Sequence, residues 1–221
     1  MIQIRINERV YLKDPETSEL GKKIVSCGIS MIDQNGFELT TFKKIATRIS
    51  STEASVYRYF ENKHKLLIYL VSYYWNWLEY QLEFHTNNIA DPETRIRVAM
   101  NVISQPHAFP QPLLSIDAEA LHRIVVKESP KAYLSHEVDE DNKEGYFLSY
   151  KRLCERISSI ISEINPAYPY PKALISTLIE SAHNQAFFST HLPRLTEIKK
   201  GDEKQITDFL IDVVMRVTRP L

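Results

Sequence analysis

The chain has 221 residues, of which 43% are hydrophobic and 25% charged, and its formal net charge is −1. With only 5 Gly and 2 Cys, this composition fits one or two globular domains and excludes low-complexity and disulfide-stapled chains. No apolar run approaches the roughly 20 residues of a membrane span. We therefore expect no membrane partner and a cytoplasmic location.

Positive charge is concentrated near the N-terminus. Residues 22–65 carry eight basic and four acidic side chains, a net charge of +4, whereas the whole chain carries −1 and the remainder therefore −5. A basic end on an otherwise acidic protein is the distribution expected when one domain contacts nucleic acid and the rest does not.

The apolar pattern changes period early in the chain. The first dozen residues alternate isoleucine with polar residues, which predicts a strand or an extended arm. From Leu20 the period becomes helical, and Gly36 is a natural stop for the first helix. Thr40 and Thr41 both offer an N-cap for the next short helix, and Thr52 offers one for the short helix after it. These three helices can share a small core.

The remainder of the chain is predicted to be helical throughout. A helix of about six turns, roughly 30 Å, runs from Lys63 to Phe84 and is long enough to connect two domains. No convincing strand and no internal repeat follow, so we predict an all-α fold of about nine helices. Further helices are expected from Pro92, over 116–126, along the stripe 150–164, over 172–191 and over 205–217.

Thr41 to Leu67 carries the strongest functional signal. Two short amphipathic helices flank a polar turn, which is typical of a helix-turn-helix that reads the major groove with its second helix. In that helix Val56 and Phe60 face back toward the core. Lys63 and the helix start at Thr41 suit phosphate groups. The residues at or near the outward side are Glu53, Ala54, Ser55, Tyr57, Arg58 and Tyr59.

Two other interpretations of the chain are open. A helical ligand-binding or protein-interaction module would keep this fold without binding operator DNA, but it would have no reason to keep a basic, hydroxyl-rich face. An enzyme would need parts that the sequence lacks: there is no Gly-rich phosphate loop, no paired-cysteine metal motif and no His-Glu-x-x-His. We therefore predict no enzymatic activity, no metal site and no cofactor.

Two spaced patterns mark the same segment, Thr-x3-Ile-Ala from Thr41 and Tyr-x-Tyr-Phe-x2-Lys-x2-Leu-Leu from Tyr57. With them the chain resembles the N-terminal domain of the tetracycline-repressor (TetR) family of bacterial regulators, over about a quarter of its length. The turn departs from the family pattern at Ser50, where glycine is usual, and at Ser51. Ser50 must accept a strained backbone, or the turn differs in shape.

The resemblance implies a ligand-responsive repressor that binds a palindromic operator in double-stranded DNA as a homodimer. By family, Thr41, Tyr57 and Lys63 match phosphate-contacting positions, and Glu53 to Ser55 match base-reading ones. A homodimer is also reasonable on physical grounds, because one helix-turn-helix buries too little surface for tight binding. The predicted DNA-contacting residues are Thr41, Thr52, Glu53, Ala54, Ser55, Tyr57, Arg58 and Lys63.

The resemblance also implies how the chain is organised. We predict an N-terminal arm at 1–19, a DNA-binding domain at 20–65, and an effector-binding and dimerisation domain at 66–221. The last two long helices resemble the family's dimerisation pair, although a monomer core would also explain their apolar stripes. An unknown small molecule is expected to bind among aromatic and polar side chains. The candidate lining is Tyr74, Phe109, His122, Tyr150, His183 and Phe187.

Overall fold

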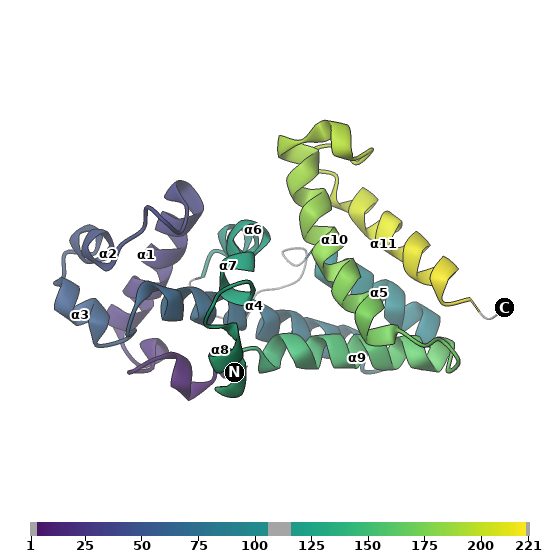
Figure 1. Cartoon of the computed structure of the whole chain (residues 1–221), viewed down its shortest axis with the longest axis horizontal. Coiled ribbons are helices and arrows are strands. Elements are labelled where there is room, and N and C mark those ends of the chain that lie inside the picture. Colours follow the sequence, from purple (N-terminus) through teal and green to yellow (C-terminus); the bar gives the residue numbers. More distant parts are fainter. Residues whose placement is uncertain (1–3, 106–115, 220–221) are drawn as a thin grey trace. The chain divides into compact units, whose positions relative to one another are not determined.

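The computed structural model describes residues 4–105 and 116–219, and all regular structure in them is helical (Figure 1). The predicted all-α class is confirmed, with eleven α-helices in the described residues where about nine were expected. They are α1 (Glu19–Asn35), α2 (Phe42–Arg48), α3 (Glu53–Tyr57), α4 (Lys63–Thr86), α5 (Pro92–Ser104), α6 (Ala118–Glu128), α7 (Pro130–Tyr133), α8 (Val138–Lys143), α9 (Leu148–Ile164), α10 (Pro171–His191) and α11 (Glu203–Val217). Short 3-10 turns are η1 (Glu8–Val10), η2 (Pro15–Thr17) and η4 (Pro193–Leu195).

Residues 4–18 do not form a strand, which was one of the two predictions for the alternating isoleucines. The described residues before α1 form the turns η1 and η2, and the side chains of Asn7 and Asp14 cap them by accepting a backbone N–H. The backbone N–H of Leu12 donates to the carbonyl of Tyr59 at 2.8 Å. The segment therefore pairs with the end of a helical region rather than with another strand, which is why the period of two was misleading.

Helix boundaries follow the caps that the sequence predicts. α2 begins after Thr41 and α3 after Thr52, and each threonine hydroxyl accepts a backbone N–H in the first turn, from Lys44 at 3.3 Å and from Ser55 at 3.2 Å. α1 is stopped by Gly36, whose φ of 81° is a left-handed value that glycine adopts at no steric cost.

Two short helices were not predicted. α7 begins at Pro130, which suits a first helical position because proline has no N–H to lose. α8 forms within an acidic stretch. Asp139 and Glu140 lie in its first turn, where their negative charge interacts favourably with the positive end of the helix dipole. Neither is long enough to display a helical apolar period, and the buried residue of α8 is a carboxylate, Asp141.

The contacts divide the chain into two compact units, of which the first comprises residues 1–77 and 111–149. α1, α2, α3 and the first turns of α4 share a core in which Ile45, Val56 and Phe60 are fully buried. α6 packs against α1. The guanidinium of Arg123 on α6 donates to both carboxylate oxygens of Asp33 on α1, at 3.0 and 2.8 Å.

The second unit comprises residues 78–110 and 150–221. α5 packs against α11, and α10 packs against both (Figure 1). Between α5 and α11, the hydroxyls of Ser104 and Thr207 share a hydrogen bond of 2.6 Å. The buried carboxylate of Glu79, in the C-terminal half of α4, accepts from the Nε atoms of Arg152 and Arg156 of α9 at 2.9 and 3.0 Å. None of the described helices combines the length and apolar character that a membrane crossing requires.

The two units are defined by contacts between residues, and their boundaries differ from those of the three predicted segments. The predicted boundary at residues 65 and 66 falls in the first turn of α4, whereas the division between units falls later in that helix, after Trp77. α6, α7 and α8 belong to the first unit. α4 therefore contributes to both units, and the assignment of separate DNA-binding and effector-binding domains stays a prediction.

Candidate nucleic-acid interface

α3 has one buried and one exposed side, as its sequence predicts. Val56 and the following Phe60 are fully buried and attach the helix to the core. Glu53 and Ala54 are exposed, and Ser55 is half-buried. The three residues expected to read bases therefore lie together on the first turn of a helix whose opposite side is fixed.

The C-terminal end of α3 only partly matches the predicted face. Tyr57 is 47% exposed, and its ring lies edge-on to that of Phe42 in α2 at 4.9 Å. Arg58 is exposed. The outward placement of Tyr59 is wrong: it is 3% exposed, and its hydroxyl shares a hydrogen bond of 2.7 Å with Ser18. α3 ends at Tyr57, so the helical period no longer applies to the residues after it.

The two cap threonines, Thr41 and Thr52, are both exposed. Thr41 and Thr52 each use the hydroxyl oxygen to accept a backbone N–H. The hydroxyl of Thr52 also pairs with that of Ser55 at 2.8 Å. An oxygen that caps a helix can still donate its O–H, so both threonines retain a group suited to a phosphate oxygen.

The turn between α2 and α3 carries the strain expected at Ser50. Its φ of 55° is the single positive φ among the non-glycine residues that the structure describes. The left-handed conformation costs an L-residue roughly 1–2 kcal/mol. Backbone hydrogen bonds from Ser50 to Thr47 at 3.2 Å and from Ser51 to Ala46 at 2.8 Å hold the turn closed. Serine therefore accepts the strained backbone at the position where glycine is usual.

Lys63, expected to contact a phosphate, already has partners within the chain. Its Nζ donates to the carbonyl oxygens of Phe37 at 3.3 Å and Glu38 at 3.2 Å and lies 3.5 Å from the Glu38 carboxylate. The ammonium also lies 4.5 Å from the centre of the Phe37 ring. An ammonium has three N–H donors. A phosphate contact would thus require Lys63 to exchange at least one of these partners.

The turn after α1 is also held by α6 and α7, a connection that sequence reasoning missed. The backbone N–H of Phe37 donates to the carboxylate of Glu128 at 3.1 Å. Lys131 bridges Glu128 at 2.7 Å and Glu38 at 3.2 Å. The hydrogen bond and charge of Lys131 hold the pKa of the Glu38 carboxyl below its usual value. These partners are about 90 residues apart, so no local spacing announces them.

Basic side chains also line a groove beside the motif. A cavity of about 440 Å³ lies between α1 and the end of α2, and its lining includes Lys22, Lys23 and Arg48 against one carboxylate, Glu19. Arg48 donates to the amide oxygen of Gln34 at 3.2 Å. The positive charge counted in residues 22–65 is thus partly gathered on one side of α1 and α2, where it suits an anionic partner.

Two of the predicted effector-binding residues meet in the first unit. The hydroxyl of Tyr74 on α4 and Nδ1 of His122 on α6 are 2.9 Å apart, and the two rings stack with centres 5.8 Å apart. Tyr74 is fully buried and His122 is 9% exposed. This pair links α4 with α6 inside the core of the unit.

Three more predicted lining residues lie in the second unit, on α9 and α10. The hydroxyl of Tyr150 donates to Glu180 at 3.4 Å, and burial raises the pKa of the Glu180 carboxyl. His183 is buried, which lowers its pKa to about 4. Phe187 is half-buried, with its ring 4.5 Å from that of His191. Phe109 lies outside the described residues, and a shared pocket stays a prediction.

The N-terminal segment matches a known family. Residues 24–70 match the family described as bacterial regulatory proteins, tetR family. This range contains α2, α3, the turn between them and the first turns of α4. The patterns from Thr41 and Tyr57, on which the predicted resemblance was based, both lie inside it.

Longer similarities extend over most of the chain. It is 22% identical over 184 residues to the probable HTH-type transcriptional regulator YttP of Bacillus subtilis (strain 168), covering 78% of this chain and 88% of that protein. A bacterial regulatory protein of the tetR family from Rhodococcus RHA1 superposes with a TM-score of 0.65 at 18% identity, covering 92% and 99% of the two chains. AibR in complex with isovaleryl coenzyme A and operator DNA superposes with a TM-score of 0.57 at 17% identity, covering 86% and 95%.

Proposed function

Because the chain belongs to the tetR family of bacterial regulatory proteins through its N-terminal domain, we propose that it is a ligand-responsive transcriptional repressor. It would bind a palindromic operator as a homodimer, and it would act in the cytoplasm, where the bacterial chromosome lies. This is the role of a regulator and not of an enzyme.

The observation that carries the proposal is the exposed first turn of α3. Glu53, Ala54 and Ser55 lie there, on a helix held from behind by buried side chains, and Arg58 follows at its end. A recognition helix needs this combination of a fixed back and a free N-terminal face, because base edges are read by side chains near the start of the helix. We assign base contacts to these three residues and phosphate contacts to Thr41, Thr52, Tyr57, Arg58 and Lys63.

A homodimer is supported by the apolar surface of α11. Ile206, Leu210 and Val214 are buried within the unit. A second apolar stripe runs beside them at i, i+4 and i+8, and in it Phe209 is 40% and Val217 is 43% exposed. A helix that is apolar on two sides can bury one side in its own unit and the other against a second copy.

The oligomeric state can be measured directly. The wild type is expected to sediment as a dimer, and Phe209→Glu is expected to sediment as a monomer, because a charge would be placed within the proposed apolar contact. Phe84→Glu, at a residue that is 64% exposed on α4, is the matched control and should remain dimeric. A wild-type monomer at micromolar concentration would contradict this part of the proposal.

A response to a small molecule is proposed by analogy with AibR, which has been seen with isovaleryl coenzyme A and operator DNA. A ligand changes DNA affinity only as far as it binds the two states of the protein with different affinity. α4 is the element placed to link the two events, because it starts beside the reading motif and contributes to both units. Tyr74, His122, Tyr150, His183 and Phe187, with Phe109, are the proposed effector-contacting side chains.

Operator binding is tested by selection from random duplex DNA with purified protein. We expect an enriched palindrome with two half-sites about one helical turn apart. Arg58→Ala should bind the selected DNA more weakly, whereas Arg194→Ala, an exposed arginine of η4, should bind like the wild type. Recovery of no palindrome, with only weak, salt-sensitive binding, would contradict the proposal and favour a helical module that does not bind operator DNA.

A further inference from the structure

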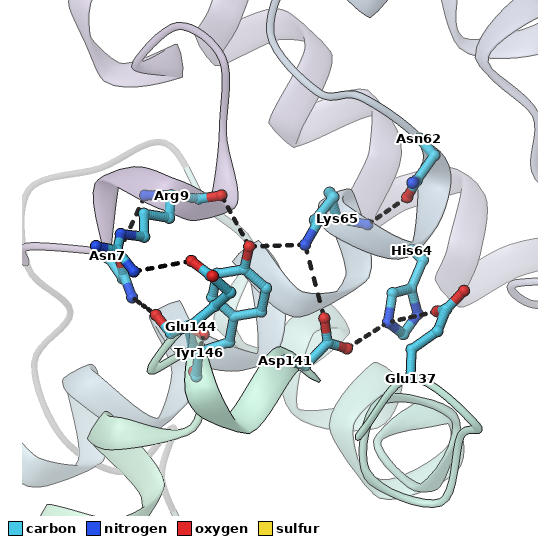
Figure 2. Close-up of polar contacts among 10 residues, drawn as sticks. Asn7, Arg9, Asn62, His64, Lys65, Glu137, Asp141, Glu144 and Tyr146 are labelled. Atoms are coloured by element: carbon cyan, nitrogen blue, oxygen red, sulfur yellow. Dashed lines mark hydrogen bonds and ion pairs between the residues drawn. The ribbon is translucent and has the colours of Figure 1, made fainter. Parts of the chain in front are cut away.

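Three metal-ligating side chains converge where α4 meets α8 in the first unit. Nε2 of His64, in the first turn of α4, lies 2.9 Å from Oδ2 of Asp141 and 3.4 Å from Oε2 of Glu137. Figure 2 shows His64 directed toward both carboxylates. All three donor atoms lie within 4.8 Å of one another. None of these residues belongs to the proposed DNA-reading face.

The backbone places the two carboxylates on one side of α8. Glu137 and Asp141 are four residues apart, and the backbone N–H of Asp141 donates to the carbonyl of Glu137 at 2.9 Å. Residues spaced by four lie one above the other on a helix. His64 is positioned independently, because Asn62 accepts the backbone N–H of Lys65 at 2.9 Å and so caps the first turn of α4. The cluster is thus built on two helices and not on loops.

The separations fit donors around one metal ion. Two donors that each lie about 2.1 Å from Zn²⁺, at an angle between 90° and 110°, are roughly 3.0–3.4 Å apart. The distance from His64 to Glu137, 3.4 Å, falls in this interval. The distance to Asp141, 2.9 Å, is that of their direct hydrogen bond and would lengthen slightly around an ion. Small movements of the exposed Glu137 side chain would complete the arrangement.

Lys65 fixes Asp141 from the opposite side. Its ammonium lies 3.6 Å from Oδ1 of Asp141, 2.8 Å from the Tyr146 hydroxyl and 3.9 Å from the centre of that ring. As Figure 2 shows, Lys65 and His64 approach different oxygens of the carboxylate. Lys65 thus holds Oδ1, as outer partners do at metal sites. Oδ2 shares a hydrogen bond with Nε2 of His64, and an ion placed between these two atoms would replace that bond.

Charge and exposure also suit a cation. Two carboxylates face one ammonium here, so the cluster has an excess of negative charge when His64 is neutral. The side chain of Asp141 is 7% exposed and that of His64 is 19% exposed, whereas that of Glu137 is 69% exposed. The site is thus closed on one side and open on the other, which leaves a path of entry and room for water as a further ligand.

We propose that His64, Glu137 and Asp141 bind a divalent transition-metal ion of the Zn²⁺ class. One imidazole with two carboxylates is a donor set that Zn²⁺ accepts, and three protein ligands leave a fourth position for water. The bound ion would join the first turn of α4 to α8. The proposal replaces the expectation from sequence that the chain has no metal site, and it does not depend on the proposed function.

In the test, full-length, tag-free, chelator-treated protein is titrated with Zn²⁺, and calorimetry measures the stoichiometry and affinity of binding. We expect one Zn²⁺ per chain, and binding weakened about tenfold or more in both His64→Ala and Glu137→Gln. Glu140→Gln removes a neighbouring exposed carboxylate of α8, which pairs with Lys143, and His191→Ala removes an exposed histidine elsewhere. Both controls should bind like the wild type.

A second measurement guards against variants that fail to fold. Zn²⁺ that binds only the folded chain raises the thermal midpoint. The midpoint of the wild type and of Glu140→Gln should therefore rise with Zn²⁺, and that of Glu137→Gln, which changes an exposed side chain, should not. Absence of Zn²⁺ binding by the wild type, or equal binding by wild type, His64→Ala and Glu137→Gln, would overturn the proposal. Both readouts are obtained without DNA, so failure of operator binding does not affect them.

Discussion

The outward face of α3 and the junction of α4 with α8 are both polar, yet they are built in opposite ways. On α3 the polar side chains are neighbours in sequence and exposed, and the buried Val56 lies on the opposite side of the same short helix. At the junction, Asp141 is buried and its partner His64 is 77 residues away.

Substitutions in the two regions should therefore change different quantities, the affinity for a partner on α3 and the stability of the fold at the junction. An exposed side chain contributes little to folding, so a change on the α3 face should alter a partner's affinity and leave the fold intact. The buried carboxylate of Asp141, which pairs with Lys65 and His64, is different, because removing it leaves its partners desolvated and unpaired. The following predictions test that separation, from the largest expected effect to the smallest.

The largest effect is expected from Asp141→Asn at the junction. The change leaves Lys65 without its carboxylate partner in a largely buried position, and we expect a loss of about 3 kcal/mol in the free energy of unfolding. Urea denaturation measures it. Asp139→Asn, an exposed residue of the same helix, should change the free energy by less than about 0.5 kcal/mol. Equal losses of stability in Asp141→Asn and Asp139→Asn would contradict the claim that the buried charge at the junction stabilises the fold.

On the α3 face, Glu53→Ala is expected to change sequence preference. A side chain that reads a base edge contributes roughly 1–3 kcal/mol to discrimination at that base pair. Competition binding with operators that differ at one position at a time would show the change confined to one or two positions. The urea midpoint should stay near that of the wild type. Uniform weakening on all operators would mean that Glu53 is not a base-reading residue.

Lys63 lies in neither region, and Lys63→Ala should affect both DNA binding and stability. Loss of its contacts with the turn after α1 is expected to lower the free energy of unfolding by about 1 kcal/mol. Binding to all operators should weaken similarly, and the logarithmic salt dependence should fall by about one ion. Salt titrations of DNA binding measure this. A changed sequence preference would contradict the assignment of Lys63 to phosphate.

The smallest effect is expected from Ser50→Gly in the turn before α3. Glycine relieves left-handed strain of roughly 1–2 kcal/mol, but its freedom in the unfolded chain offsets roughly 0.5–1 kcal/mol of that. A net gain of about 0.5–1 kcal/mol in the free energy of unfolding is expected from thermal denaturation. Ser51→Gly, at a neighbouring residue without a positive φ, should give no gain. A loss at Ser50 would show that its side chain stabilises the turn.

Much of the motif could be predicted because its signals are local. The caps at Thr41 and Thr52, the stop at Gly36 and the strain at Ser50 each depend on a residue and its near neighbours. Tyr59 was misplaced because the helical period was extended two residues beyond Tyr57, where α3 ends. Of the two predictions for the N-terminus, a strand or an arm, the strand is not formed by residues 4–18, because an alternating pattern needs a partner strand and the described residues contain none.

The sequence by itself determined the helical class, the starts of α2 and α3 and the residues that face outward on α3, because the period and the caps act within a few residues. Only the tertiary structure decided that Lys63 contacts the turn after α1 and that Asp141 meets His64 and Lys65. Those pairs form when helices distant in sequence pack together. Which residues pair depends on how the helices pack and on the need to satisfy buried charge. Neither can be predicted from the spacing of neighbouring residues in the sequence.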